Sequence, residues 1–173
     1  MKGKIKFKRG KVGKTLYTRL YNLFKNTFNV NPEEYIGRVN RDELRYICIN
    51  DLCIIHSIIA GAIGPSTNII YQGRWVATIV KGEITPSIPL VKKIYSSKGF
   101  RAAVLVGEKG VKAFLYGNDI LLESIIEKYE PVDGLVSIID SSDNEVIGFA
   151  KWNPGKKVFE NIYDLGIYLR ILG

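Results

Sequence analysis

The second half of the chain is interrupted by turns at short intervals, and this spacing limits what it can fold into. Between residues 102 and 155, short apolar runs are separated by segments rich in glycine, serine and proline. Short strands joined by such turns are typical of a small β-barrel. We expect strands over 102–106, 134–140 and 145–151, turns over 107–110, 141–144 and 153–155, and helices over 111–126 and 164–172.

The first half mixes helical and strand patterns. Leu16, Leu20, Leu23 and Phe24 recur at helical spacing, which predicts a helix over 16–28. The apolar run 52–64 is too short to cross a membrane, so the sequence predicts a buried helix over 51–59. Strands are expected over 44–48, 67–71 and 74–80, with Gln72-Gly73 as a hairpin turn between the last two.

A polar stretch, 92–98, with serines at its centre, is expected to be a linker. The sequence therefore predicts two domains in an α+β protein. Residues 1–94 would form an N-terminal α/β domain with a mainly antiparallel sheet, and residues 98–173 a small C-terminal β-barrel. With 46% apolar and 24% charged residues, the chain has the balance of a globular protein with a real core.

Positive charge is concentrated at the start of the chain. The whole sequence has 25 lysines and arginines against 17 acidic residues, a formal net charge of +8. A basic surface attracts polyanions such as nucleic acid or an acidic membrane. Residues 1–14 are either a solvated arm or part of a binding surface, and the sequence leaves both interpretations open. No acid occurs among the first 32 residues, where the basic residues are Lys2, Lys4, Lys6, Lys8, Arg9, Lys11, Lys14, Arg19 and Lys25.

The two cysteines, Cys48 and Cys53, lie close together in an apolar stretch. The lysine-rich N-terminus is not followed by an apolar core, so we expect no signal peptide. Reduced thiols in a cytoplasmic protein are the consequent expectation. With His56 these cysteines offer three soft ligands. No further histidine or cysteine can complete a structural zinc site, so no metal is predicted.

Two other arrangements resemble catalytic or nucleotide sites only superficially. The segment 10–15 has two residues between its glycines where a phosphate-binding loop needs four. Cys53 and His56 would lie on one predicted helix without a clear orienting acid. The sequence therefore predicts no catalytic residue and no cofactor.

A basic cluster surrounds the predicted turn at 153–155. It consists of Lys151, Trp152, Lys156 and Lys157. Lysines neutralise phosphates without sequence preference, and an indole can stack on a base. These four residues are the candidate nucleic-acid-binding site. The alternative is a charged hairpin tip that only keeps the protein soluble.

Three segments of the C-terminal half resemble a known family. They are VKAFLYGNDIL at 111–121, NEVIGFA at 144–150 and DLGIYLR at 164–170. Together they resemble the PUA domain, an RNA-binding module, and more narrowly the Nip-seven family of large-subunit ribosome biogenesis factors. Members of that family are similar in placing a short α/β domain before a C-terminal PUA domain.

The resemblance implies a non-enzymatic RNA-binding protein in pre-rRNA processing and large ribosomal subunit assembly. It implies that Lys151, Lys156 and Lys157 contact single-stranded rRNA, with a preference for U- or AU-rich segments. Other assembly factors would bind the N-terminal domain. We expect a monomer that does not bind membranes. The alternatives are an RNA-modifying enzyme or its targeting subunit, and a protein-interaction adaptor in the pre-ribosome.

Overall fold

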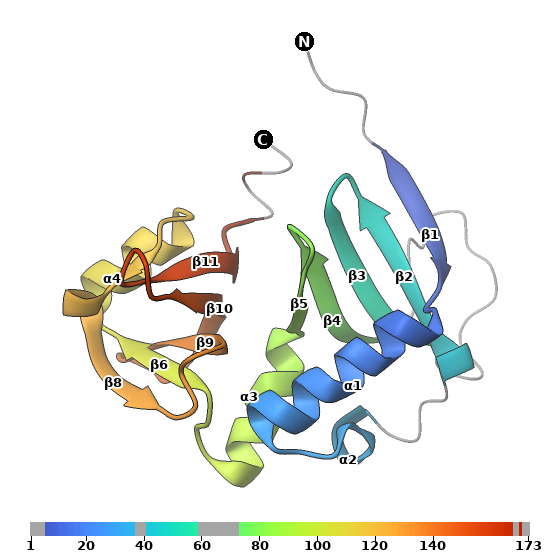
Figure 1. Ribbon diagram of the computed structural model, residues 1–173, viewed down its shortest axis with the longest axis horizontal. Helices are drawn as coiled ribbons and strands as arrows, with labels where there is room; N and C mark the ends of the chain where they lie inside the picture. Colours follow the sequence, from blue (N-terminus) through green and yellow to red (C-terminus); the bar gives the residue numbers. More distant parts are fainter. Residues whose placement is uncertain (1–5, 37–40, 59–72, 168–169, 171–173) are drawn as a thin grey trace. The chain divides into compact units, whose positions relative to one another are not determined.

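The structure, a computed structural model, describes residues 6–36, 41–58, 73–167 and 170 (Figure 1). The chain divides into two compact units, residues 1–90 and 91–173. Each contains one sheet. No helix in the described part is both long and apolar enough to cross a membrane.

The N-terminal unit contains a five-stranded antiparallel sheet in the order β1-β2-β3-β4-β5. Successive strands are neighbours, so β1 and β5 form the two edges. Helices α1 and α2 and a short 3₁₀ helix, η1, lie between β1 and β2 in the sequence. The elements are β1 (Phe7–Lys11), α1 (Lys14–Phe28), α2 (Pro32–Ile36), η1 (Arg41–Glu43), β2 (Leu44–Ile49), β3 (Leu52–Ser57), β4 (Arg74–Val80) and β5 (Glu83–Pro86).

Helix α1 confirms the helix predicted from apolar spacing. Leu20, Phe24 and Phe28 form its buried stripe, so the aromatic residues of this helix belong largely to the core. The helix ends at Asn29, which adopts the left-handed conformation (φ 54°) and donates its backbone N–H to the carbonyl of Phe24. Strand β1, directly before α1, was not predicted, because its residues are mostly basic.

The helix predicted over 51–59 is wrong, because Leu52–Ser57 form strand β3. A two-residue turn, Asn50-Asp51, joins β3 to β2, and Asn50 has the positive φ (53°) that such a turn requires. Since β3 is hydrogen-bonded to β2 on one side and β4 on the other, it is an interior strand. Its sequence has no polar alternation, so periodicity alone cannot distinguish it from a buried helix. The strand predicted over 67–71 and Gln72 of the predicted turn lie outside the described residues.

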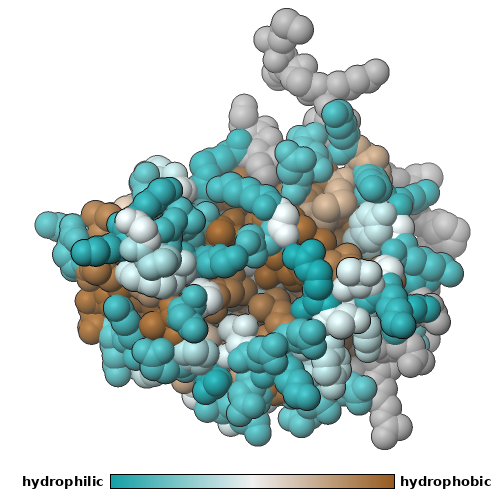
Figure 2. Space-filling model, viewed as in Figure 1, coloured by the Kyte–Doolittle hydropathy of each residue, from teal (hydrophilic) through white to brown (hydrophobic). Residues whose placement is uncertain are grey.

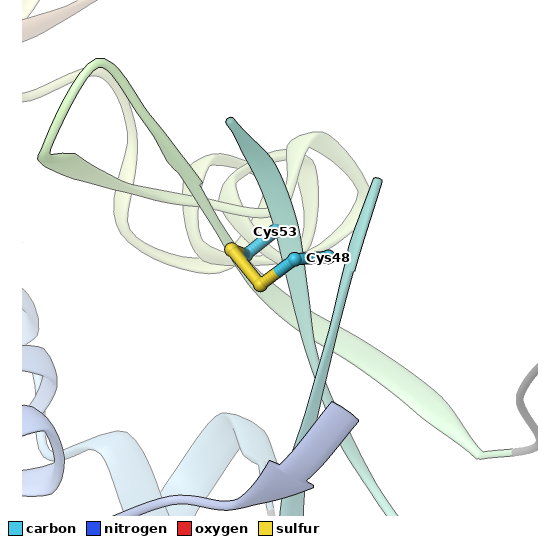
Figure 3. The surroundings of a disulfide bond; sticks show 2 residues. All are labelled: Cys48 and Cys53. Atoms are coloured by element: carbon cyan, nitrogen blue, oxygen red, sulfur yellow. A yellow bond between two sulfur atoms is a disulfide. The ribbon is translucent and has the colours of Figure 1, made fainter. Parts of the chain in front are cut away.

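A disulfide joins Cys48 and Cys53, which contradicts the expectation of reduced thiols (Figure 3). The two residues are direct partners in the β2–β3 register, with Cα atoms 3.9 Å apart. The corrected hairpin explains the error, because a helix over 51–59 would not have placed the two side chains opposite each other. Both thiols are used by the disulfide, so neither serves as a thiolate ligand for zinc.

The predicted linker at 92–98 is also wrong, because it belongs to helix α3 (Ile88–Lys98). Val91, Ile94 and Tyr95 are buried at helical spacing. The serines do not end the helix. Ser96 and Ser97 donate their hydroxyls to the carbonyl of Lys93, at 2.9 and 3.2 Å, a local bond that serines make within helices.

The C-terminal unit contains a six-stranded sheet in the order β7-β11-β10-β9-β6-β8. It curls into an open half-barrel (Figure 1). Strands β6 and β9 are parallel, and all other neighbours are antiparallel. The elements are β6 (Ala103–Val106), α4 (Glu108–Leu115), β7 (Ile120–Leu121), η2 (Leu122–Ser124), β8 (Ile125–Tyr129), β9 (Leu135–Asp140), β10 (Val146–Asn153) and β11 (Val158–Asp164).

The three strands predicted in this half are present as β6, β9 and β10. The helix predicted over 111–126 begins earlier and is shorter, because the chain leaves α4 at Gly117 with φ at +89°. Strands β7, β8 and β11 were not predicted. Asp164, expected to start the last helix, is the final residue of β11, and 168, 169 and 171–173 lie outside the described residues.

The expected fold class, an α+β protein with an antiparallel sheet followed by a small barrel, is confirmed. Val104, Phe114, Ile138 and Phe159 are among the core residues of the half-barrel. Gly148 of β10 has no room for a side chain. A Cβ there would be 2.2 Å from the carbonyl oxygen of Tyr163, and φ is +159°, so only glycine fits.

Candidate nucleic-acid interface

The four predicted site residues lie on one β-hairpin, formed by β10, β11 and the turn between them. Lys151 and Trp152 lie at the end of β10, while Lys156 and Lys157 belong to the turn. All three lysines are exposed. The hairpin thus presents Lys151, Trp152, Lys156 and Lys157 within a short span of chain, and we call it the lysine hairpin.

The positive charge of the lysine hairpin is partly offset by Glu160 on β11. The Nζ of Lys156 donates to Oε1 of Glu160 at 2.8 Å, and the side-chain amide of Asn153 donates to the same oxygen at 2.9 Å. Glu160 is also the cross-strand partner of Lys151. The hydrogen bond from Lys156 lowers the pKa of Glu160, and it raises the pKa of Lys156. Both groups are therefore firmly charged at neutral pH, and this acid competes with any phosphate for Lys156.

Trp152 is partly buried and packs against the half-barrel core. Its ring centroid lies 5.0 Å from that of Phe159, its cross-strand partner, with the rings inclined by 51°. Phe159 itself is fully enclosed. The indole is thus anchored in the core, and only part of its surface is exposed for stacking on a base.

The structure also brings to the lysine hairpin a fourth lysine that the sequence did not single out. Lys128, an exposed residue of β8, places its Nζ 5.9 Å from the ring centroid of Phe159. Strand β8 and the β7–β11 pair are at opposite ends of the strand order, so the curl of the half-barrel brings β8 close to β11. Lys128 was missed because no local pattern joins it to a turn 25 residues later.

One exposed apolar side chain lies beside the lysine hairpin, and others are exposed elsewhere on the C-terminal unit. Strand β7 pairs with β11, with Leu121 opposite Val158. The side chains of Leu121, Leu122, Ile126 and Tyr116 are all exposed, Tyr116 to 81%. Figure 2 shows apolar atoms at the surface in this part of the C-terminal unit, among otherwise hydrophilic side chains. Exposed lysines together with apolar and aromatic groups suit a ligand with both charged phosphates and flat bases.

The described residues offer little for other chemistry. No group of three or more histidine, cysteine or acidic side chains within them lies close enough to hold a metal ion. One buried ionisable group with a clear structural role is Tyr95. Its hydroxyl donates to the carbonyl of Arg101 and bonds to the hydroxyl of Ser137, both at 2.8 Å. Burial raises the pKa of Tyr95, so it stays neutral and acts as a structural hydrogen-bonding group.

The order of strands in the half-barrel, the close approach at Gly148 and the lysine hairpin all lie within one segment of the chain. Residues 102–173 match the family model of the UPF0113 PUA domain. The PUA domain is an RNA-binding fold, so this match supports RNA binding by the segment that carries the lysine hairpin. The comparison with curated proteins found no match.

Solved structures of archaeal proteins share the fold over nearly the whole chain. A conserved PUA domain protein from Thermoplasma acidophilum superposes with a TM-score of 0.51 at 14% identity, covering 92% of this chain and 95% of its own. A hypothetical protein from Pyrococcus horikoshii gives a TM-score of 0.56 at 14% identity, with 91% and 94% covered. A PUA domain protein from Aeropyrum pernix, solved as a tartrate complex, gives 0.56 at 12% identity, with 97% and 91% covered. At these identities the likeness shows the fold alone.

Proposed function

We propose that this protein binds single-stranded RNA through the lysine hairpin of its PUA domain and has no catalytic activity of its own. The observation that carries the proposal is the coincidence of the PUA match over 102–173 with the exposed lysines of the β10–β11 turn. Sequence-specific recognition of RNA usually reads unstacked single-stranded bases. Lysines beside a partly exposed indole match the phosphates and bases of such a strand.

The biological role that we propose is pre-rRNA processing and assembly of the large ribosomal subunit. Support for it comes from the resemblance of 111–121, 144–150 and 164–170 to the Nip-seven family. The same resemblance favours U- or AU-rich segments of rRNA, and other assembly factors as partners of the N-terminal unit. This role places a monomeric protein in the cytoplasm. Disulfides are rare in cytosolic proteins outside hyperthermophiles, so a Cys48–Cys53 disulfide in the cytoplasm requires a source of that kind.

The test is a titration of fluorescent U-rich RNA with the wild-type protein and the triple variant Lys151→Ala, Lys156→Ala, Lys157→Ala. Each phosphate contact on a single strand contributes about 0.7 to the slope of log affinity against log salt. Loss of three contacts should lower the slope by about 2 and weaken binding about a hundredfold at 0.1 M salt. Competition by a large-subunit rRNA transcript and by an unrelated transcript of equal length tests the proposed target.

The control is a second triple variant that removes the same charge elsewhere in the C-terminal unit. Lys92, Lys93 and Lys98 lie exposed on α3, and Lys92 is ion-paired with Glu145 just as Lys156 is paired with Glu160. Their replacement by alanine should leave the slope nearly unchanged. Equal losses in the two triples would mean that the lysine hairpin contributes only net charge, and the proposed site would be wrong.

A further inference from the structure

The net charge of the protein is carried entirely by one of its two units. Residues 1–90 contain 14 lysines and arginines and 6 acidic residues, a balance of +8. Residues 91–173 contain 11 of each, so the unit that includes the PUA domain is formally neutral. Because the counterion-release contribution to RNA binding scales with the cations that meet phosphates, this distribution directs attention to the N-terminal sheet.

A row of three basic or titratable side chains crosses the first three strands of that sheet. Lys11 on β1 pairs with Arg45 on β2, and Arg45 pairs with His56 on β3. Residues directly paired across strands point to the same face. Arg9, two residues before Lys11, points to that face as well. We call this surface the basic sheet face.

The basic sheet face is the side of the sheet away from α1. Leu44, which precedes Arg45, lines a small cavity together with Leu20 of α1 and Ile36 of α2. Successive side chains along a strand point to opposite faces, so Arg45 lies on the other side. Helices α1 and α2 lie against the face of the sheet that carries Leu44, so they do not cover the basic sheet face of β1 and β2 (Figure 1).

The basic sheet face is hollowed. A depression of about 430 Å³ is lined by Arg9, Lys11, Arg45, His56 and the apolar Ile47 and Ile58, together with Gly10 and Tyr46. None of the described residues that line it is acidic. In the described part of the structure neither Arg9 nor Lys11 forms an ion pair with a carboxylate. Lys11 and Arg45 are cross-strand partners, so one phosphate can be reached by both side chains.

Protection of the edge strand explains only part of this pattern. Lysines on an edge strand discourage pairing with other chains, and β1 is an edge, so Lys8 and Lys11 fit that explanation. Arg45 does not, because β2 is an interior strand. Its guanidinium presents a fixed fork of donors that suits phosphate, and one of its nitrogens already donates to the Leu44 carbonyl at 3.0 Å, which holds it against the sheet.

We infer that the basic sheet face is a second RNA-binding surface, which holds the phosphate backbone of a single strand without reading its bases. The inference rests on the proposed function only in the choice of ligand. Arg9, Lys11 and Arg45 contact the phosphates, and the apolar floor formed by Ile47 lets the strand lie close. The surface adds affinity, while the PUA domain supplies any preference for sequence.

The test compares two double variants of the full chain that each remove one arginine and one lysine from the N-terminal unit. Arg9→Gln with Lys11→Gln alters the basic sheet face, whereas Arg19→Gln with Lys25→Gln alters α1. Loss of two phosphate contacts should lower the salt slope by about 1.4 and weaken binding about 25-fold at 0.1 M salt. The α1 variant should lose little. The single variant Arg45→Gln should weaken binding independently, and circular dichroism checks that each variant is folded.

The outcomes separate this inference from the proposed function. If the basic-sheet-face variant behaves like the α1 variant while the lysine-hairpin triple loses binding, the inference is overturned and the proposed function stands. If the basic-sheet-face variant alone loses binding, the inference holds and the lysine hairpin is not the site. A wild-type protein without salt-dependent affinity for any RNA refutes both.

Discussion

The two units of this protein offer opposite arguments for where RNA binds. The C-terminal unit has the family match and a hairpin with three exposed lysines, yet its formal charge is zero and Glu160 pairs with one of those lysines. The family match lies outside the N-terminal unit, yet this unit holds the entire net charge of +8. Fold relationship and charge are therefore independent sources of information, and here they indicate different surfaces.

The difference is consistent with a division of work. Phosphate contacts supply affinity without sequence information, whereas base contacts and stacking supply specificity. The lysine hairpin combines its cations with Trp152, and Leu121 of the neighbouring strand β7 adds an exposed apolar group, which suits contact with bases. The basic sheet face combines cations with a hollow, which suits contact with a backbone. One RNA bound at both surfaces would gain from the high effective concentration of the second contact.

The largest effect is expected when both surfaces are altered together. A variant that combines the lysine-hairpin triple with Arg9→Gln and Lys11→Gln loses five candidate phosphate contacts. On a long single strand the salt slope should fall by about 3.5, which is a loss of roughly 3,000-fold at 0.1 M salt. The measurement is a titration with a long and a short U-rich RNA over a range of salt.

The same titration has an outcome that breaks the comparison. If the combined variant binds no more weakly than the lysine-hairpin triple, the long RNA meets only the PUA domain, and the charge of the N-terminal unit serves another purpose. If the loss is multiplicative on the long RNA but not on the short one, one strand spans both surfaces.

The lysine hairpin was predictable from sequence because its signal is local. Asn153, Pro154 and Gly155 mark a turn, and the strand before them has an apolar pattern, so Lys151 and Lys156 could be placed beside each other. Lys128 could not be placed there from the sequence, because only the curl of the sheet brings β8 close to the lysine hairpin. Glu160 was overlooked although it follows Lys156 by four residues, because the strand that holds it, β11, was not recognised.

The basic sheet face could not be predicted from the sequence for a related reason. The row Lys11–Arg45–His56 depends on the pairing of three strands, one of which was mistaken for a helix. An apolar run such as 52–57 is ambiguous until its neighbours are known, since an interior strand and a buried helix both lack polar alternation. The two-residue turn Asn50-Asp51 was the available signal, and reading it as a hairpin would have placed His56 opposite Arg45.

An intermediate effect is expected at Trp152, where stability and binding must be separated. Because the indole packs on Phe159 at 5.0 Å, Trp152→Ala should cost about 2–3 kcal/mol of unfolding free energy, less than a fully buried tryptophan. Urea denaturation measures this loss. Trp152→Phe keeps an aromatic ring in place and should retain most of the stability. If this conservative variant also retains full RNA affinity, any aromatic ring there satisfies the RNA, and the indole has no special role in binding.

The smallest effect is expected at Glu160. A variant at this position tests whether an acidic residue of the formally neutral C-terminal unit weakens RNA binding. Glu160→Gln removes the carboxylate that binds Lys156 and lies opposite Lys151, so Lys156 is released to bind phosphate. An exposed ion pair holds its partners only weakly, so we expect RNA binding to become tighter by up to about fivefold. Glu108→Gln is the matched control, because Glu108 forms the equivalent pair with Lys112 on α4. Tighter binding by the first variant alone would mean that Glu160 restrains the lysine hairpin. Equal tightening by both variants would mean that RNA responds only to the total charge of the C-terminal unit. The neutrality of that unit would then limit its affinity for RNA, and the basic sheet face would have to supply the remaining binding affinity.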